Sequence, residues 1–408
     1  MRRLAAAVVF GGCVLLLGCS SSSEQPATST SPAAPTAAGP VGGPQPPVVT
    51  PLIAEVVSAP IPVPATDGKV HLAYELRLTN VLSHDVTITG ATVLDRDVAL
   101  ASLKGDQLSS LTRILGTATP ATILGPAQTA VIWLDVALEQ GGATPTALTH
   151  AISLSNPQPQ PPLFPATQTM NVAPVTVQTR TPIEISPPLS GPDWVNGDGC
   201  CGMSAHRTAL NPIDGGLWAA ERFAIDYVQL GPDGRLVTGD PEMLDSFAYF
   251  GADVHAVTDG PVVAVRDGLP EQVPGENPTG LPLDQYAGNH VVQDLGDGNY
   301  ALYAHIKTVT VTVKAGDRLT AGQVIGNVGN TGNTTAPHLH FHVMSTPDPL
   351  RSDGLPFVFT DFRLDARVVD AKDLDVILEG RPAPLRPVGR DETAVMPLEL
   401  DVMTYADR

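Results

Sequence analysis

The sequence has few charged residues, and fewer of them are basic than acidic. Only 16% of its 408 residues are charged, and 42 Asp and Glu outnumber 23 Lys and Arg, for a formal net charge of −19. Nucleic-acid-binding proteins carry clustered basic residues, so the composition excludes binding to a phosphate backbone. The same charge disfavours loose electrostatic adsorption to anionic membranes or polymers. An acidic partner would have to be recognised by shape and specific contacts.

The N-terminal apolar stretch, Leu4 to Leu17, is too short for a comfortable membrane span. It follows Arg2 and Arg3 and runs into Leu16-Leu17-Gly18-Cys19. This order resembles a bacterial lipoprotein signal, in which the chain is cut before the cysteine and that cysteine receives lipid. We therefore expect residues 1–18 to be a signal peptide and Cys19 to be the lipidation site of an exported protein. An ordinary secretory signal and a short anchor helix are the alternatives.

Cysteine is scarce. Of the four in the chain, Cys13 lies inside the predicted signal, which leaves Cys200 and Cys201 beyond Cys19. Because exported proteins meet oxidising conditions, the adjacent pair is predicted to form a vicinal disulfide. Two reduced buried thiols and thiolate ligation of a metal are the alternatives, and a better ligand set elsewhere argues against ligation.

Strands, turns and linkers are favoured over long helices by 40 Pro and 38 Gly. Residues 19–50 are rich in Ser, Pro and Ala with almost no large apolar side chains, which predicts a disordered tether. Apolar residues then alternate with period two at 72–78 and 132–138. This pattern predicts an immunoglobulin-like β-sandwich over residues 51–175, acting as a spacer or docking module.

A second strand-rich region is predicted over residues 176–370, followed by a C-terminal extension at 371–408. Gly296-Asp297-Gly298-Asn299 is a hairpin signal, and residues 267–288 form a Gly- and Pro-rich loop long enough to wall a binding site. The chain is therefore expected to be mainly β, with an N-terminal sandwich and a C-terminal antiparallel β domain.

Residues with metal chemistry gather in the second region. Within Pro337–His342, the side chains of His338, His340 and His342 share one strand face. Imidazole is the commonest protein metal ligand, although a merely polar strand face is the alternative. Asp226 lies in an apolar run, where a buried carboxylate needs a cation as partner. Two histidines and one aspartate suit a catalytic zinc ion with an open coordination position.

The sequence around these residues resembles the lysostaphin-like, LytM-type zinc metallopeptidases, which hydrolyse peptidoglycan peptides. The resemblance covers about residues 206–345 and says nothing about residues 20–175. It is carried by His206 followed by Asp226, and by the segments Gly288–Val292, Tyr303–His305, Val313–Asp317, Gly322–Gly326, Gly329–Asn333 and Pro337–Phe341.

The resemblance implies that His206, Asp226 and His340 bind one zinc ion per chain and that His305 and His338 are a catalytic pair. Residues 176–370 would be a zinc metallopeptidase domain that cuts wall peptides with a metal-activated water. The protein would face the cell wall or periplasm, with peptidoglycan peptides as substrate and a lipid as its sole membrane attachment. Other histidines are expected to be structural: His71, His84, His150, His255 and His290.

Two departures from the family pattern stand out. The family usually separates the first histidine and the aspartate by a few residues, whereas an insertion that includes Pro212–Trp218 lies between His206 and Asp226 here. His342 occupies a position where the family often has an acidic residue. We expect it to contact a metal ligand without binding the metal itself. If the insertion covers the groove, the alternative is a latent or inactive adaptor that activates other cell-wall enzymes.

Overall fold

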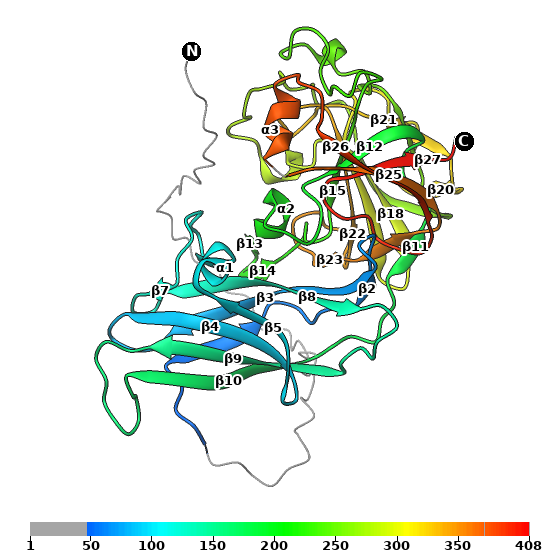
Figure 1. Ribbon diagram of the computed structural model, residues 1–408. Helices are drawn as coiled ribbons and strands as arrows, with labels where there is room; N and C mark the ends of the chain where they lie inside the picture. Colours follow the sequence, from blue (N-terminus) through cyan, green and yellow to red (C-terminus); the bar gives the residue numbers. More distant parts are fainter. Residues whose placement is uncertain (1–46, 371, 408) are drawn as a thin grey trace, which may run out of the picture. The chain divides into compact units, whose positions relative to one another are not determined.

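Strands dominate the structure, which confirms the predicted mainly β fold. The computed structural model describes residues 47–370 and 372–407 (Figure 1). The predicted signal peptide, Cys19 and most of the predicted tether lie outside these residues. Nowhere in the described chain is a helix both long and apolar enough to cross a membrane.

The N-terminal region forms two antiparallel sheets that enclose one apolar core. The first sheet has the order β1-β3-β8-β6, with β2 also paired to β3. Its strands are β1 (Leu52–Val56), β2 (Val63–Pro64), β3 (Lys69–Asn80), β6 (Thr112–Ile114) and β8 (Thr129–Glu139). The second has the order β10-β9-β4-β5, with β7 paired to β4. Its strands are β4 (Val86–Asp95), β5 (Val98–Lys104), β7 (Ile123–Leu124), β9 (Ala147–Ser155) and β10 (Thr167–Thr176), and helix α1 (Gly105–Ser110) follows β5.

Strand β3 is buried on both faces. Leu72, Tyr74 and Leu76 fill the sandwich core, as their alternation predicts. The residues between them, Ala73 and Glu75, are buried as well. Ala73 packs in a second small cluster with Val63 of the neighbouring β2 and with four residues from distant parts of the chain: Cys200, Phe223, Val358 and Met396. The outer face of the first sheet is therefore covered by the second region.

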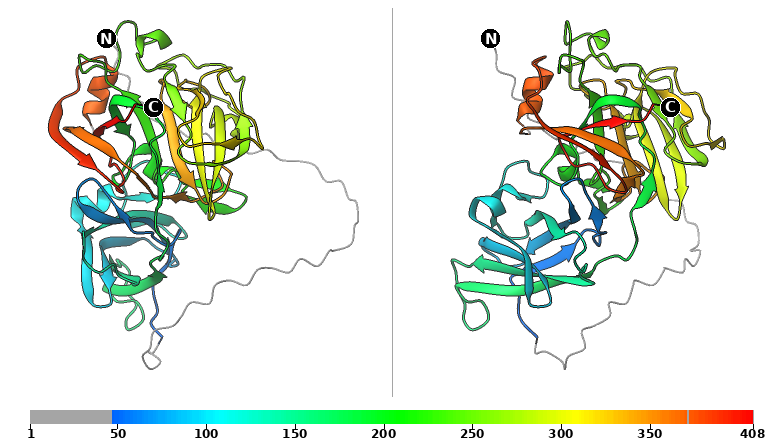
Figure 2. Two further views of the ribbon diagram at one scale, coloured as in Figure 1. Left: turned by 90° about the vertical axis from the view of Figure 1, so that its right-hand side faces the viewer. Right: turned by 45° about the vertical axis from the view of Figure 1, so that its right-hand side comes forward.

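The second region is built on one large sheet (Figure 2). It has eleven strands: ten follow the order β20-β17-β18-β19-β22-β15-β12-β27-β25-β26, and β23 pairs with β22. Its strands are β12 (Gly191–Gly197), β15 (Ile225–Gln229), β17 (Gly260–Arg266), β18 (Asn289–Gly296), β19 (Asn299–Ile306), β20 (Arg318–Leu319), β22 (Leu339–Met344), β23 (Gly354–Leu355), β25 (Phe362–Val368), β26 (Leu385–Glu392) and β27 (Asp401–Tyr405).

The remaining strands and helices of this region are short. Three pairs of strands lie outside it: β11 (Ile183–Ile185) with β24 (Phe357–Phe359), β13 (Asn211–Ile213) with β14 (Gly216–Trp218), and β16 (Asp253–His255) with β21 (Val324–Asn327). The helices are single turns or slightly longer: α2 (Ala205–Thr208), η1 (Leu244–Ser246), η2 (Leu283–Gln285) and α3 (Asp373–Leu378). As predicted, β18 and β19 form a hairpin at Gly296–Asn299.

The residues expected as a separate C-terminal extension belong to the large sheet instead. Strand β27 pairs with β12 on one side and β25 on the other. Val402, Met403 and Tyr405 are buried in the main core. The chain end inserts between β12 and β25 because these apolar side chains complete that core. The mixed sequence pattern of this segment did not indicate such a place.

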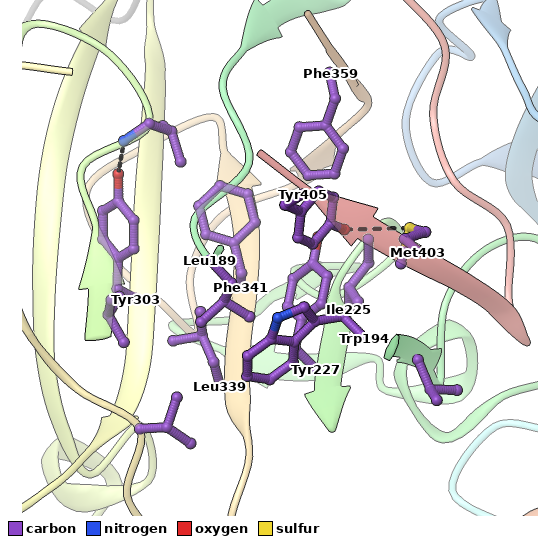
Figure 3. Close-up of a cluster of buried hydrophobic side chains, with 14 of the residues drawn as sticks. Leu189, Trp194, Ile225, Tyr227, Tyr303, Leu339, Phe341, Phe359, Met403 and Tyr405 are labelled. Carbon is purple, nitrogen blue, oxygen red and sulfur yellow. Dashed lines mark hydrogen bonds between the residues drawn. The ribbon is translucent and has the colours of Figure 1, made fainter. Parts of the chain in front are cut away.

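The core of the large sheet is rich in aromatic rings (Figure 3). Phe341 on β22 is fully buried, with its ring centroid 5.3 Å from that of Tyr303 and 5.3 Å from that of Phe357. Leu339 and Val343 on the same strand face this core. Since strand side chains alternate, the intervening residues of β22 face the opposite side.

We expect Phe341→Ala to lower the free energy of unfolding by about 3–5 kcal/mol, because truncating a fully buried ring loses apolar burial and leaves a cavity. Phe341→Leu keeps more of the volume and should cost less. Urea unfolding of both variants measures the difference. Equal stability of the alanine variant and the unmodified protein would contradict this packing.

Candidate metal centre

The register between β15 and β22 creates the centre. Asp226 lies directly across from His340, and the flanking pairs, Ile225 with Phe341 and Tyr227 with Leu339, face the core. The carboxylate and the imidazole therefore project together from the other face of the sheet. Asp226 Oδ1 is 2.9 Å from His340 Nδ1.

His206 reaches the same carboxylate from helix α2. Its Nε2 is 3.3 Å from Asp226 Oδ1. Its Nδ1 lies 3.3 Å from the carbonyl oxygen of Ala224, which accepts a hydrogen bond from Nδ1–H, so Nε2 is the ring nitrogen that faces the carboxylate. The insertion between His206 and Asp226 loops out as the β13–β14 hairpin, so the long sequence separation does not keep the two side chains apart.

His305 and His338 complete the cluster. His305, at the end of β19, donates Nδ1–H to the carbonyl oxygen of Thr331 at 2.7 Å. His338, just before β22, donates Nδ1–H to that of Ala336 at 2.8 Å. Each ring therefore turns its Nε2 toward the centre, where His338 Nε2 lies 3.3 Å from Asp226 Oδ1, and the two ring centroids are 4.6 Å apart.

Two overlapping sets of three residues can hold a metal ion, and both contain His340. One is His206, Asp226 and His340, and the other is His305, His338 and His340; in each, the three donor atoms lie within 4.8 Å of one another. Zinc bonds of about 2.0–2.1 Å in tetrahedral geometry place neighbouring ligand atoms about 3.3 Å apart. The first set, at 2.9 and 3.3 Å from Asp226 Oδ1, fits a zinc ion.

The electrostatics also favour a cation. Burial alone would raise the pKa of Asp226, but the charges of His206 and His338 hold it well below its usual range, so the carboxylate is ionised. Burial alone would lower the pKa of His206, yet the carboxylate of Asp226 raises it to about 10. A divalent ion bound there would replace the positive charge that the neighbouring protonated histidines otherwise place next to the Asp226 carboxylate.

His342 lies behind His340. Its Nδ1 is 2.7 Å from His340 Nε2. Burial, followed by the charges of His340 and His206, holds the pKa of His342 well below its usual range, so this ring is neutral. If His340 binds a metal ion through Nδ1, its ring proton is on Nε2, and this N–H donates a hydrogen bond to His342 Nδ1. In that tautomer, the contact with His342 would orient the His340 ring.

The other histidines find partners away from this cluster. These contacts are His84 Nε2 to Asn156 Oδ1, His150 Nε2 to the Tyr74 hydroxyl, His255 Nδ1 to the Gly322 carbonyl and His290 Nδ1 to the Gly288 carbonyl. His71 is held between Asp67 and Asp135. His71 and Asp135 also lie within ligand distance of the sulfur of Cys201. That sulfur is bonded to Cys200, which removes the thiolate that a metal needs.

Glu399 was missed by the sequence reasoning. Burial, and then the negative charge of Asp198, raise its pKa to about 7, against the opposing charge of His206. Its backbone N–H binds the carbonyl of Cys200. Glu399 comes from the C-terminal segment far from any motif, so no spacing in the sequence pointed to it.

We expect His342→Leu to weaken zinc binding by about 10–100-fold, because it removes the acceptor that orients His340. His342→Gln offers an amide oxygen in its place and should bind zinc more tightly than the leucine variant. Competition titration against a chromogenic chelator measures both affinities. Unchanged affinity of the leucine variant would show that His342 does not support the ligand.

Comparison with known proteins adds to this geometry. Residues 244–352 match the model described as "Peptidase family M23". The matched span contains His305, His338, His340 and His342, whereas His206 and Asp226 precede it. Among solved structures, the catalytic domain of lysostaphin from Staphylococcus simulans shares 24% sequence identity with a TM-score of 0.20, covering 38% of this chain and 80% of that one.

Two curated relatives are similar over short stretches. The glycyl-glycine endopeptidase ALE-1 of Staphylococcus capitis is 35% identical over 113 residues, 27% of this chain and 29% of the relative. The peptidoglycan DD-endopeptidase ShyA of Vibrio cholerae is 39% identical over 67 residues, 16% of this chain and 15% of the relative. The chain thus spans less than a third of the length of either relative. The matched family model and these two relatives show that the chain contains a domain of peptidase family M23.

Proposed function

We propose that the protein is a zinc-dependent endopeptidase that hydrolyses peptide bonds in bacterial peptidoglycan. The observation that supports this most is the convergence of His206, Asp226 and His340, from three separate segments, on one point of the β15–β22 face. A zinc ion held there would act as a Lewis acid on a peptide carbonyl and lower the pKa of a bound water. The names of the relatives, which are peptidoglycan and glycyl-glycine endopeptidases, support the substrate class.

The ligand set is assigned to His206, Asp226 and His340 because it combines two imidazoles with the ionised carboxylate. This leaves His305 and His338 beside the ion. With each Nδ1–H held by a backbone carbonyl, each Nε2 can accept a proton from the attacking water or, once protonated, donate to the carbonyl oxygen.

The long loop at 267–288 is tied to the segment that orients His305. Glu271 accepts from the backbone N–H groups of Thr308 and Asn330 at 2.7 and 2.6 Å. Gln272 and Gly275 add backbone bonds to Asn330 and Thr335. A loop held in this way suits the wall of a peptide-binding groove, which sets the choice of bond.

The site of action follows from the substrate. Peptidoglycan lies outside the cytoplasmic membrane, so we propose that the protein is exported and attached through lipid on Cys19. The sequence signal at Leu16–Cys19 supports this attachment.

The decisive experiment separates metal binding from chemistry. Asp226→Ala and His340→Ala should lose zinc and activity together. His305→Ala and His338→Ala should keep zinc and lose about 10²–10⁴-fold in rate, the contribution of a positioned acid or base. Zinc analysis is paired with mass spectrometry of peptides released from purified peptidoglycan, and from defined peptides with oligoglycine or D,D-cross-links.

If the unmodified protein binds zinc and releases no peptide from any of these substrates, the proposed activity is wrong. Stimulation of a separate wall amidase by that inactive protein would support the adaptor alternative. Absence of zinc after incubation with excess ion would contradict the ligand assignment itself.

Gly288 provides a second test, because it packs against the carbonyl that orients His305. A Cβ at Gly288 would lie 2.1 Å from the carbonyl oxygen of Thr331. Gly288→Ala should therefore displace His305 and reduce cleavage on the order of 100-fold, as expected for misplaced catalytic groups, with zinc retained. Gly298→Ala is the matched control, since Gly298, in the β18–β19 turn and outside the 267–288 loop, also has positive φ but no atom within 4 Å of the added Cβ. Equal activity of the two variants would contradict this role of the Thr331 carbonyl.

A further inference from the structure

A carboxylate and two guanidinium groups are buried together where the β-sandwich meets the metal-binding region. Glu75 lies on β3 of the sandwich and is fully buried. Arg207 on α2 and Arg222 just before β15 are 1% and 4% exposed. Glu75 lies outside residues 206–345, which carry the resemblance to the peptidase family, and neither arginine belongs to the proposed ligands or catalytic pair.

Glu75 is bound by both arginines. Arg207 Nη1 donates to Glu75 Oε1, and Arg222 Nε lies 3.0 Å from each carboxylate oxygen. Burial alone would raise the pKa of Glu75, but the charges of Arg222 and Arg207 lower it, so the carboxylate stays ionised. Arg207 Nη2 also donates to the carbonyl oxygen of Leu134 on β8, at 3.2 Å. The side chain of Arg207 is therefore held by two adjacent strands of the sandwich.

Both arginines are close in sequence to proposed zinc ligands. Arg207 directly follows His206, and successive helical residues diverge by about 100° around the axis, so anchor and ligand point to different sides. Arg222 precedes Asp226 by four positions, and between them Ala224 supplies the carbonyl that orients His206. Phe223 packs against Ala73 of β3 in the small apolar cluster.

Helix α2 has little intrinsic stability. It consists of Ala205–Thr208, a single turn, and isolated helices shorter than about 12 residues are marginal in water. Ser204 caps it by accepting from the backbone N–H of Arg207. Another attachment is the buried charge pair of Arg207 with Glu75, which ties this turn to the sandwich.

We propose that Glu75 is a positioning residue for the metal centre, acting through Arg207 and Arg222 to hold His206 and the Ala224 carbonyl that orients it. The sandwich is then a structural part of the centre rather than the spacer or docking module that its sequence suggested. This inference rests on the proposed role of His206 as a zinc ligand.

Glu75→Gln removes the charge and keeps the shape of the side chain. We expect zinc affinity to fall about 10–100-fold, the range seen when a partner that orients a ligand is lost. Thr66→Val is the matched control, because Thr66 Oγ1 donates to buried Asp401 and so joins the sandwich to the large sheet away from α2. Its zinc affinity should stay within about twofold of the unmodified protein. Equal losses in both variants would overturn a specific role for Glu75.

A double-mutant cycle with His206→Ala separates positioning from general destabilisation. If Glu75 acts through His206, Glu75→Gln should have little further effect on zinc affinity once His206 is absent. An additive loss would overturn the proposal. The zinc titrations are made on the full chain, with circular dichroism recording that each variant is folded.

Burying an unpaired arginine can prevent folding, so a second variant removes the whole charge cluster. Glu75→Leu combined with Arg207→Met and Arg222→Met replaces it by apolar groups, an exchange that often preserves stability. This triple variant should fold and still bind zinc less tightly, whereas affinity equal to the unmodified protein would overturn the proposal. These results are independent of peptide cleavage: if unmodified protein binds zinc but cuts no wall peptide, the proposed function fails while the positioning role can still be measured.

Discussion

The pairing of β15 with β22 is the constraint on which the rest of the structure depends. It places Asp226 opposite His340 and, one residue to either side, buries Ile225 with Phe341 and Tyr227 with Leu339. A register slip of one residue would turn the ligands into the core and the aromatic rings out of it. The apolar core therefore selects the only register that brings the carboxylate and imidazole together, and the free energy of core packing pre-organises the site.

The sequence predicted what is local and periodic. Alternation in Pro337–His342 placed His338, His340 and His342 on one face, and the structure gathers them there. Asp226 stood out as a carboxylate in an apolar run, but its role as a ligand and the role of His305 were assigned through the family resemblance, because strands far apart in sequence bring them to the cluster. The closeness of His206 to Asp226 was hardest to foresee, since it depends on the β13–β14 hairpin looping out.

What could not be predicted involves contacts between regions. Ala73 and Glu75 alternate with the core-facing residues of β3. In a sandwich, strand residues at such alternate positions are expected to face solvent. Their burial requires a second surface, which Phe223 and the two arginines provide. The same limit applies to β27, whose place between β12 and β25 is decided by long-range pairing and not by its own pattern.

The candidate ligands differ in how firmly the fold holds them. Asp226 and His340 lie on central strands of the large sheet, paired on both sides and backed by buried rings. His206 lies on one helical turn, in a segment that also carries the Cys200–Cys201 disulfide and precedes an insertion. A ligand in such a segment loses more conformational entropy when the site forms than one on a strand. A buried ion pair is weak support for overall stability but has a defined geometry. The Glu75 cluster therefore lies where defined geometry is most needed, beside the ligand that secondary structure holds least.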